Sequence, residues 1–229
     1  AVEDYSIKCY HNNVHGLQNL ELSFANSCNG AFASLGLSLD LASMEELAFQ
    51  LLFNTELPLA LPYAKSTYSM KAGADTWEIL QTSIGQGMTQ VTPIHMAMMT
   101  AAIANGGILM KPYVIERVNN AAGEEVKKFL PSSAKSLMTA QEAGQLGDLM
   151  RQVVITGTGS ALRDAPYSSA GKTGSAEFET GKETHAWFIG YAPAEEPKIV
   201  VTVIVEEGGS GGQAAAPVAR KLFDQYLLR

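Results

Sequence analysis

Apolar residues recur at helical spacing within residues 17–53 of this chain of 229 residues, which predicts short helices there. Two further helices are predicted from their ends: one over 93–105, with Pro93 in its first turn and Asn105-Gly106-Gly107 after it, and one over 139–154. The last of these begins with Thr139 and has Glu142 at the third position after it, the pattern of a capping box, in which each side chain bonds the backbone N–H of the other residue. Helices are therefore expected over much of the first two thirds of the chain.

The last third of the chain has the pattern of a small sheet. The β-rich composition of this part predicts three short strands over 169–178, 185–192 and 198–206, joined by turns, and the stretch 113–118 also has the pattern of a strand. Residues 212–228 predict a closing helix, because their apolar positions again recur at helical spacing. An antiparallel meander with helices packed on it belongs to the α+β class.

We expect one domain over residues 1–229, with a helical portion at about 17–110 and a sheet portion with the closing helix at about 111–229. Apolar residues make up 46% of the chain and charged residues 17%, which excludes global disorder. The formal charge of −7 argues against a nucleic-acid binder, which needs a basic face for phosphates. No apolar run is long enough for a transmembrane helix, and the first residues do not have the pattern of a signal peptide.

The stretch 168–177 contains the most informative residues of the chain. Lys172, Thr173 and Gly174 would place an ammonium, a hydroxyl and an accessible backbone on the rim of a strand. Gly174 lets a ligand approach the backbone closely. The cation and the hydroxyls can hold a carboxylate, and the N–H of Ser175 can point at a developing oxyanion. A solvated turn is the alternative interpretation of these three residues.

A second stretch, Ser27-Cys28-Asn29, follows an apolar helix. A serine hydroxyl and an asparagine amide two positions apart can share one face of a cleft, where they relay a proton and hold a substrate amide. Both residue types also cap helices well, and taken alone this stretch favours a cap.

Ser-x-Asn followed by Lys-Thr-Gly resembles the second and third motifs of the penicillin-recognising serine acyltransferases, whose first motif is Ser-x-x-Lys. The resemblance to penicillin-binding protein transpeptidase domains runs through most of the chain, in the order of that family. The matching segments are 83–87, 91–97, 104–107, 156–159 and 185–193. It implies an antiparallel sheet flanked by helices, with a helical subdomain, as in β-lactamases and transpeptidases.

The chain departs from the family in one respect. The family's Ser-x-x-Lys motif carries the nucleophile and precedes Ser-x-Asn, but residues 1–26 contain no such sequence. The stretches 132–135 and 169–172 match its spacing, yet both follow Ser-x-Asn, and neither is expected to start a helix facing the cleft. We therefore expect the C-terminal part of a transpeptidase domain, incomplete at its N-terminus and inactive alone.

The resemblance also implies roles for individual residues. Ser27 would relay a proton to the leaving group, and Asn29 would bind the donor amide. Lys172 would supply a positive field and a proton network. Thr173 and Ser175 would bind the terminal carboxylate, and the N–H of Ser175 would form half of the oxyanion hole.

The implied activity is that of a D,D-transpeptidase that cross-links peptidoglycan stem peptides ending in D-Ala-D-Ala and is acylated by β-lactams. The implied location is the extracytoplasmic face of the bacterial membrane, with other cell-wall synthesis proteins and the N-terminal part of the same protein as partners. A D,D-carboxypeptidase or β-lactamase of the same fold, and a non-catalytic penicillin-binding or sensor domain, are the alternatives.

The family implies no required cofactor, but the chain carries candidate metal ligands. Cys9, His15 and Cys28 suit Zn²⁺, which prefers thiolate and imidazole ligands. Some elongation-type transpeptidases hold a structural zinc beside Ser-x-Asn, and Cys28 and His15 match the positions of two of its ligands. The fourth ligand would be His11 or a residue outside the chain. A pair of buried thiols and a Cys9–Cys28 disulfide remain the alternatives.

Overall fold

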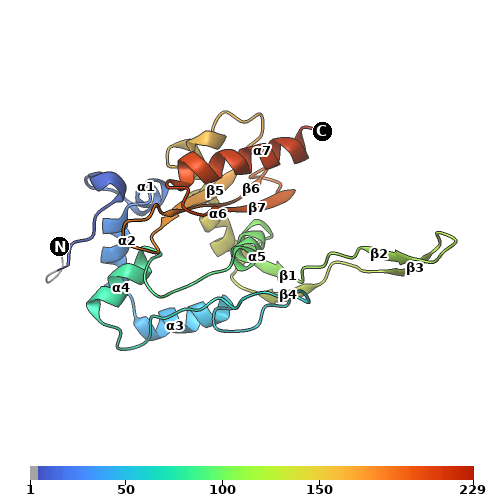
Figure 1. Cartoon of the computed structure of the whole chain (residues 1–229), viewed down its shortest axis with the longest axis horizontal. Coiled ribbons are helices and arrows are strands. Elements are labelled where there is room, and N and C mark those ends of the chain that lie inside the picture. Colours follow the sequence, from blue (N-terminus) through green and yellow to red (C-terminus); the bar gives the residue numbers. More distant parts are fainter. Residues whose placement is uncertain (1–4) are drawn as a thin grey trace.

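The computed structural model describes residues 5–229, and it combines helices with a small antiparallel sheet (Figure 1). The α-helices are α1 (Leu20–Ala25), α2 (Asn29–Gly36), α3 (Leu41–Gln50), α4 (Thr76–Ser83), α5 (Pro93–Ala104), α6 (Ala140–Ile155) and α7 (Ala216–Leu227). The strands are β1 (Ile108–Met110), β2 (Arg117–Asn119), β3 (Glu125–Lys128), β4 (Ser133–Ser136), β5 (Ala170–Ala176), β6 (His185–Ala192) and β7 (Ile199–Val205). The α+β class predicted from the sequence is confirmed.

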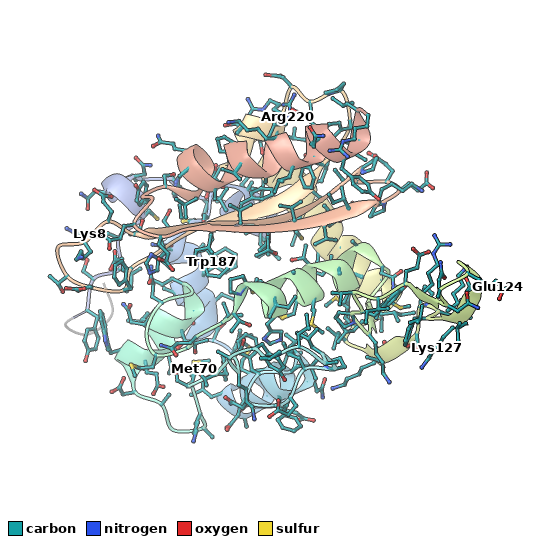
Figure 2. All side chains as sticks on the ribbon, turned by 45° about the vertical axis from the view of Figure 1, so that its right-hand side comes forward. Lys8, Met70, Glu124, Lys127, Trp187 and Arg220 are labelled. Carbon is teal, nitrogen blue, oxygen red and sulfur yellow. The ribbon has the colours of Figure 1, made fainter. Side chains whose placement is uncertain are left out.

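The sheet that positions the site has the order β5-β6-β7, with both pairs antiparallel. Helix α7 covers one of its faces, where Phe188 of β6 and Phe223 of α7 are fully buried in the main core cluster. Helices α5 and α6 lie on the opposite face, the side on which Figure 2 shows Trp187. Because β5 pairs only with β6 among the described strands, its other edge is open to side chains and ligands.

Helix α6 has the capping box that the sequence predicts. The hydroxyl of Thr139 accepts a hydrogen bond from the N–H of Glu142, whose carboxylate accepts from the N–H of Thr139. The predicted helix 93–105 is present as α5 and the three predicted late strands as β5, β6 and β7, with ends shifted by up to two residues.

Other sequence predictions were wrong in detail. The strand predicted over 113–118 is mostly irregular chain, and strand β2 begins only at Arg117. Helix α4 was not predicted, and the closing helix begins as a π-helical turn, Gly211–Ala215, before α7. The division of the domain near residue 110 stays a prediction.

Strands β2 and β3 form a hairpin arm that projects away from the body (Figure 1). All residues of both strands are exposed, and Figure 2 shows Glu124 and Lys127 toward the tip of the arm. The short pair β1–β4 lies at its base. In the described part of the chain, no helix combines the length and apolar character needed to cross a membrane.

Candidate active site

The site lies where the open edge of β5 meets the loop between α1 and α2, and Lys172 joins the two. Its Nζ donates to the hydroxyl of Ser27 at 2.9 Å and to the backbone carbonyl of Thr173 at 2.8 Å. The ammonium also lies 5.8 Å from the ring centroid of Phe24. Burial lowers the pKa of Lys172 to about 8, so its proton is held much less tightly than that of a surface lysine.

Ser27 occupies an unusual backbone conformation. Its φ is +52°, in the left-handed region, which costs a non-glycine residue free energy and recurs at functional sites. Two backbone hydrogen bonds hold the loop on either side: the N–H of Ser27 donates to Phe24, and the N–H of Cys28 donates to Ser23. The tight connection between α1 and α2 therefore directs the Ser27 hydroxyl to Lys172.

Asn29 is the first residue of α2. Its side-chain Nδ2 donates to the backbone carbonyl of Lys8 at 2.9 Å. A side-chain amide has a second N–H and an acceptor oxygen, so Asn29 retains hydrogen-bonding capacity beyond this contact. The arrangement is compatible with the predicted role in binding a donor amide.

Thr173 and Ser175 lie two positions apart on β5, so their side chains share one face of the strand. Each of the two hydroxyls forms a hydrogen bond within the protein. The oxygen of Ser175 accepts a hydrogen bond from the N–H of Gly211 at 3.2 Å, and the oxygen of Thr173 lies 2.6 Å from that of Thr158. Since Gly211 can only donate here, the proton of Ser175 is free to point toward a ligand.

Gln86 lies against the outer edge of β5. Its amide nitrogen donates to the carbonyl of Ser175 at 3.2 Å, and its amide oxygen accepts from the N–H of Glu177 at 3.0 Å. In a strand, the N–H and C=O of one residue point to the same side. The N–H of Ser175 therefore also faces the outer edge, where the predicted oxyanion donor has to lie.

The two Ser-x-x-Lys stretches inside the chain do not form a nucleophile site. Ser169 is fully buried, and its carbonyl accepts from Arg151. Ser132 is exposed at the base of the β2–β3 arm, and the nearby Lys135 donates to the carbonyl of Gln50. These positions agree with the expectation that neither serine is the nucleophile.

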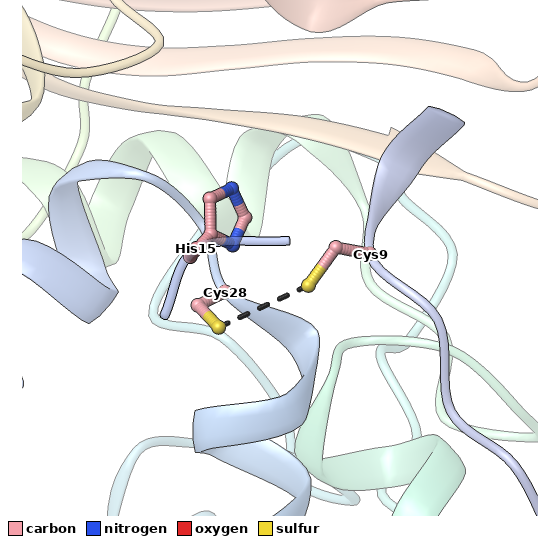
Figure 3. Close-up of side chains that lie close together, drawn as sticks. All are labelled: Cys9, His15 and Cys28. Carbon is pink, nitrogen blue, oxygen red and sulfur yellow. Dashed lines mark hydrogen bonds between the residues drawn. The ribbon is translucent and has the colours of Figure 1, made fainter. Parts of the chain in front are cut away.

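The predicted metal ligands converge beside the same loop (Figure 3). One ligand atom from each of Cys9, His15 and Cys28 lies within 4.8 Å of the others, and the two sulfur atoms are 3.8 Å apart. Both thiols are free, so the structure contains no disulfide between them. A tetrahedral zinc with Zn–S bonds of about 2.3 Å would separate two sulfur ligands by about 3.8 Å.

His15 also fits a metal ligand. Its Nδ1 is buried without a hydrogen-bond partner among the described residues, which is costly unless something unseen binds it. Burial raises the pKa of the Cys28 thiol, and the neighbouring Cys9 thiol adds to this effect. Two adjacent thiols and an unpartnered imidazole Nδ1 are a ligand set that fits a metal cation. The side chain of His11, the other predicted ligand, lies outside the described residues.

Sequence reasoning did not assign a role to Gln86, Thr158 or Gly211. Gln86 and Thr158 lie in the segments 83–87 and 156–159, which the family resemblance covers without giving either residue a role, and Gly211 belongs to a glycine-rich stretch. The structure shows why Gly211 is glycine, since an added Cβ would lie 2.3 Å from the carbonyl oxygen of Gly174. Their contacts join residues 15 to 89 positions apart, so local patterns could not reveal them.

Comparison with known proteins identifies the family. The model of the penicillin binding protein transpeptidase domain matches residues 2–224. Peptidoglycan D,D-transpeptidase PbpA of Mycolicibacterium smegmatis is 35% identical over 211 residues, which cover 88% of this chain and 42% of that protein. The chain thus spans less than half the length of this relative.

Solved structures agree with this result. The D,D-transpeptidase domain of a peptidoglycan glycosyltransferase from Eggerthella lenta superposes with a TM-score of 0.86 at 30% identity, covering 96% of this chain and 56% of that one. Penicillin-binding protein A of Mycobacterium tuberculosis, solved as a ceftriaxone acyl-enzyme complex, gives a TM-score of 0.82 at 31% identity, covering 91% and 48%. The protein therefore belongs to the penicillin-binding protein transpeptidase family.

Proposed function

We propose that this chain forms the donor-recognition part of a serine D,D-transpeptidase that cross-links peptidoglycan stem peptides and is acylated by β-lactams. The observation that carries the proposal is the bridge from Lys172 Nζ to Ser27 and Thr173, beside an outward-facing N–H of Ser175. The bridge puts a cation, a hydroxyl relay and an oxyanion donor at one strand edge.

In this proposal, a serine outside the chain attacks the carbonyl of the penultimate D-Ala of the donor peptide. The N–H of Ser175 stabilises the oxyanion, and Asn29 holds the donor amide. Thr173 and Ser175 hold the terminal carboxylate, and Lys172 supplies a positive field beside it. The proton lost by the attacking serine enters the network of Lys172 and Ser27. The C–N bond then breaks, and Ser27 passes that proton to the departing D-Ala nitrogen. An amine of a neighbouring peptide attacks the acyl-enzyme, the ester C–O bond breaks, and the released serine oxygen takes up the proton that the amine loses.

Relatives that are peptidoglycan D,D-transpeptidases, and a relative solved as a β-lactam acyl-enzyme, support these substrates and ligands. They also support a location on the extracytoplasmic face of the membrane, where peptidoglycan is cross-linked. Other cell-wall synthesis proteins are the proposed partners there.

The test is intact-mass spectrometry of the full-length protein after incubation with benzylpenicillin, followed by peptide mapping. We expect one adduct on a serine outside residues 1–229, and none on the isolated chain. An adduct on Ser132, Ser169 or Ser27 would show that the nucleophile lies within this chain. An unmodified full-length protein would contradict the proposal.

A second assay distinguishes a transpeptidase from a carboxypeptidase. With a D-Ala-D-Ala peptide as donor, a transpeptidase transfers the acyl group to an amine, and a carboxypeptidase transfers it to water.

We also propose that Cys9, His15 and Cys28 hold a structural zinc. The metal would tie the segment around residues 9–15 to the N-terminus of α2, next to Ser27 and Asn29, and it would take no part in the acyl transfer. The separation of the sulfur atoms and the unpartnered Nδ1 of His15 support this assignment.

Metal analysis of the full-length protein is expected to find one zinc per chain, which is lost in the Cys28→Ser and His15→Ala variants. The His185→Ala variant is the control, because the Nδ1 of His185 accepts from the N–H of Glu207, away from the cluster. Both thiols should react with an alkylating reagent after chelation without a reductant. If alkylation requires a reductant, the two cysteines form a disulfide and the zinc proposal is wrong.

A further inference from the structure

Thr158 lies in the turn between α6 and β5, and its hydroxyl oxygen is 2.6 Å from that of Thr173. We infer that Thr158 is a positioning residue, which orients the Thr173 hydroxyl so that its proton points at the carboxylate of the donor peptide or of a β-lactam. This inference rests on the proposed function and extends it to a residue outside the three family motifs.

The backbone around Thr158 is held firmly. The N–H of Thr158 donates to the carbonyl of Ala25 at 3.1 Å, at the end of α1, and the N–H of Gly159 donates to Val153. A Cβ on Gly157 would lie 2.1 Å from the oxygen of Ala25, and one on Gly212 would lie 2.6 Å from the oxygen of Thr158. The turn is therefore fixed between the Ser-x-Asn side of the site and β5.

The hydrogen-bonding capacity of a carboxylate determines which of the two hydroxyls, Thr158 or Thr173, donates to the other. An ionised carboxylate only accepts hydrogen bonds, so Thr173 must donate its single proton to bind one. The Thr173 oxygen can then accept from Thr158. The competing acceptor for the Thr158 proton is the carbonyl of Ala25, at 3.5 Å, which already receives the N–H of Thr158. The shorter contact favours the order Thr158 to Thr173 to carboxylate.

Ser175, on the same strand, differs from Thr173 in the kind of partner that its hydroxyl has. Its partner, the N–H of Gly211, has only a proton to give, so the Ser175 hydroxyl is always free to donate to a ligand. The Thr158–Thr173 pair can be reversed, and in the reversed order Thr173 donates to Thr158 and has no proton for the ligand. A carboxylate therefore selects one order of the pair, and it can do so only while residue 158 carries a hydroxyl.

The experiment measures acylation of the full-length protein by benzylpenicillin and by its methyl ester, which lacks the charge that the hydroxyls recognise. For the Thr158→Val variant, we expect the preference for benzylpenicillin over the ester to fall about tenfold. Thr158→Ser keeps the hydroxyl and should keep the preference. Thr156→Val is the matched control in the same turn, because among the described residues the Thr156 hydroxyl bonds only the carbonyl of Gln152, at 3.1 Å.

An equal loss with both compounds, or no change in the preference, would show that Thr158 is structural and overturn the inference. If Thr158→Val fails to fold, the smaller Thr158→Ala variant makes the same comparison. Acylation of the wild-type protein distinguishes a failure of the proposed function from a failure of the inference about Thr158. A wild-type protein that benzylpenicillin does not acylate refutes the proposed function, and the inference with it. A wild-type protein that is acylated leaves the variants to decide the inference alone.

Discussion

Replacing Lys172 by alanine in the full-length protein is expected to lower the rate of acylation by benzylpenicillin about 100- to 1,000-fold. The ammonium of Lys172 is the group that holds both the Ser27 hydroxyl and the carbonyl of Thr173. Its loss removes the positive field at the carboxylate and leaves the Ser27 hydroxyl without its partner. The rate constant is measured by stopped-flow acylation or with a fluorescent penicillin.

Lys135→Ala is the control for charge, because Lys135 bonds the carbonyl of Gln50, away from the site. It also tests the Ser-x-x-Lys stretch at residues 132–135 directly. A large loss in Lys135→Ala, or none in Lys172→Ala, would contradict the assignment of the site.

The same lysine sets a pH dependence. The pKa of Lys172 is about 8, below its ordinary value, so the ammonium is present at lower pH and is lost as the pH rises through about 8. Acylation by a carboxylate-bearing penicillin should therefore fall on the alkaline side with this pKa. The side chain in Lys172→Arg keeps its charge at higher pH, so the alkaline fall in the acylation rate should move to higher pH.

The second large effect is expected for Gly211→Ala, which should lower the free energy of unfolding by about 1–3 kcal/mol. The new Cβ would lie 2.3 Å from the oxygen of Gly174 and 2.4 Å from that of Trp187. Both obstacles are backbone atoms of the central sheet and cannot rotate away. The start of the π-helical turn must move, which also withdraws the N–H that bonds Ser175.

Thermal unfolding of the full-length protein measures this effect, and Gly144→Ala in α6 is the control. A Cβ on Gly144 meets nothing within 4 Å. Alanine is the better helix former by about 0.5–1 kcal/mol, so this variant should be slightly more stable. Equal melting temperatures for Gly211→Ala and the wild type would mean that the turn tolerates the methyl group.

The sequence predicted those parts of the fold in which burial imposes a period or a cap leaves a signature. Strands β5, β6 and β7 alternate between faces that are covered, and α6 carries its capping box. Strand β3 was not predicted, and the strand predicted over 113–118 overlaps only the start of β2, because every residue of these two strands is exposed. Helix α4 was not predicted because it buries only Leu80 and so shows no apolar period, although Asp75 and Glu78 leave a cap signature at its start.

Some residues of the candidate site could likewise be predicted from the sequence, and others could not. Ser27 and Lys172 could be singled out because their neighbours form short motifs, and the structure brings their side chains into contact. The three candidate zinc ligands could be named from residue type and also converge. Gln86 and Thr158 act through tertiary contacts with β5, which exist only once the chain is folded. Their roles therefore needed the structure.

The open edge of β5 also bears on solubility. An unpaired strand edge is a template for association with other sheets, and a protein that receives an extended peptide has to keep one. Here the exposed length is short. Gln86 occupies the carbonyl of Ser175 and the N–H of Glu177, and Lys172 occupies the carbonyl of Thr173. These three side-chain contacts shorten the stretch of the β5 edge that a neighbouring sheet could pair with, so they protect this edge from aggregation.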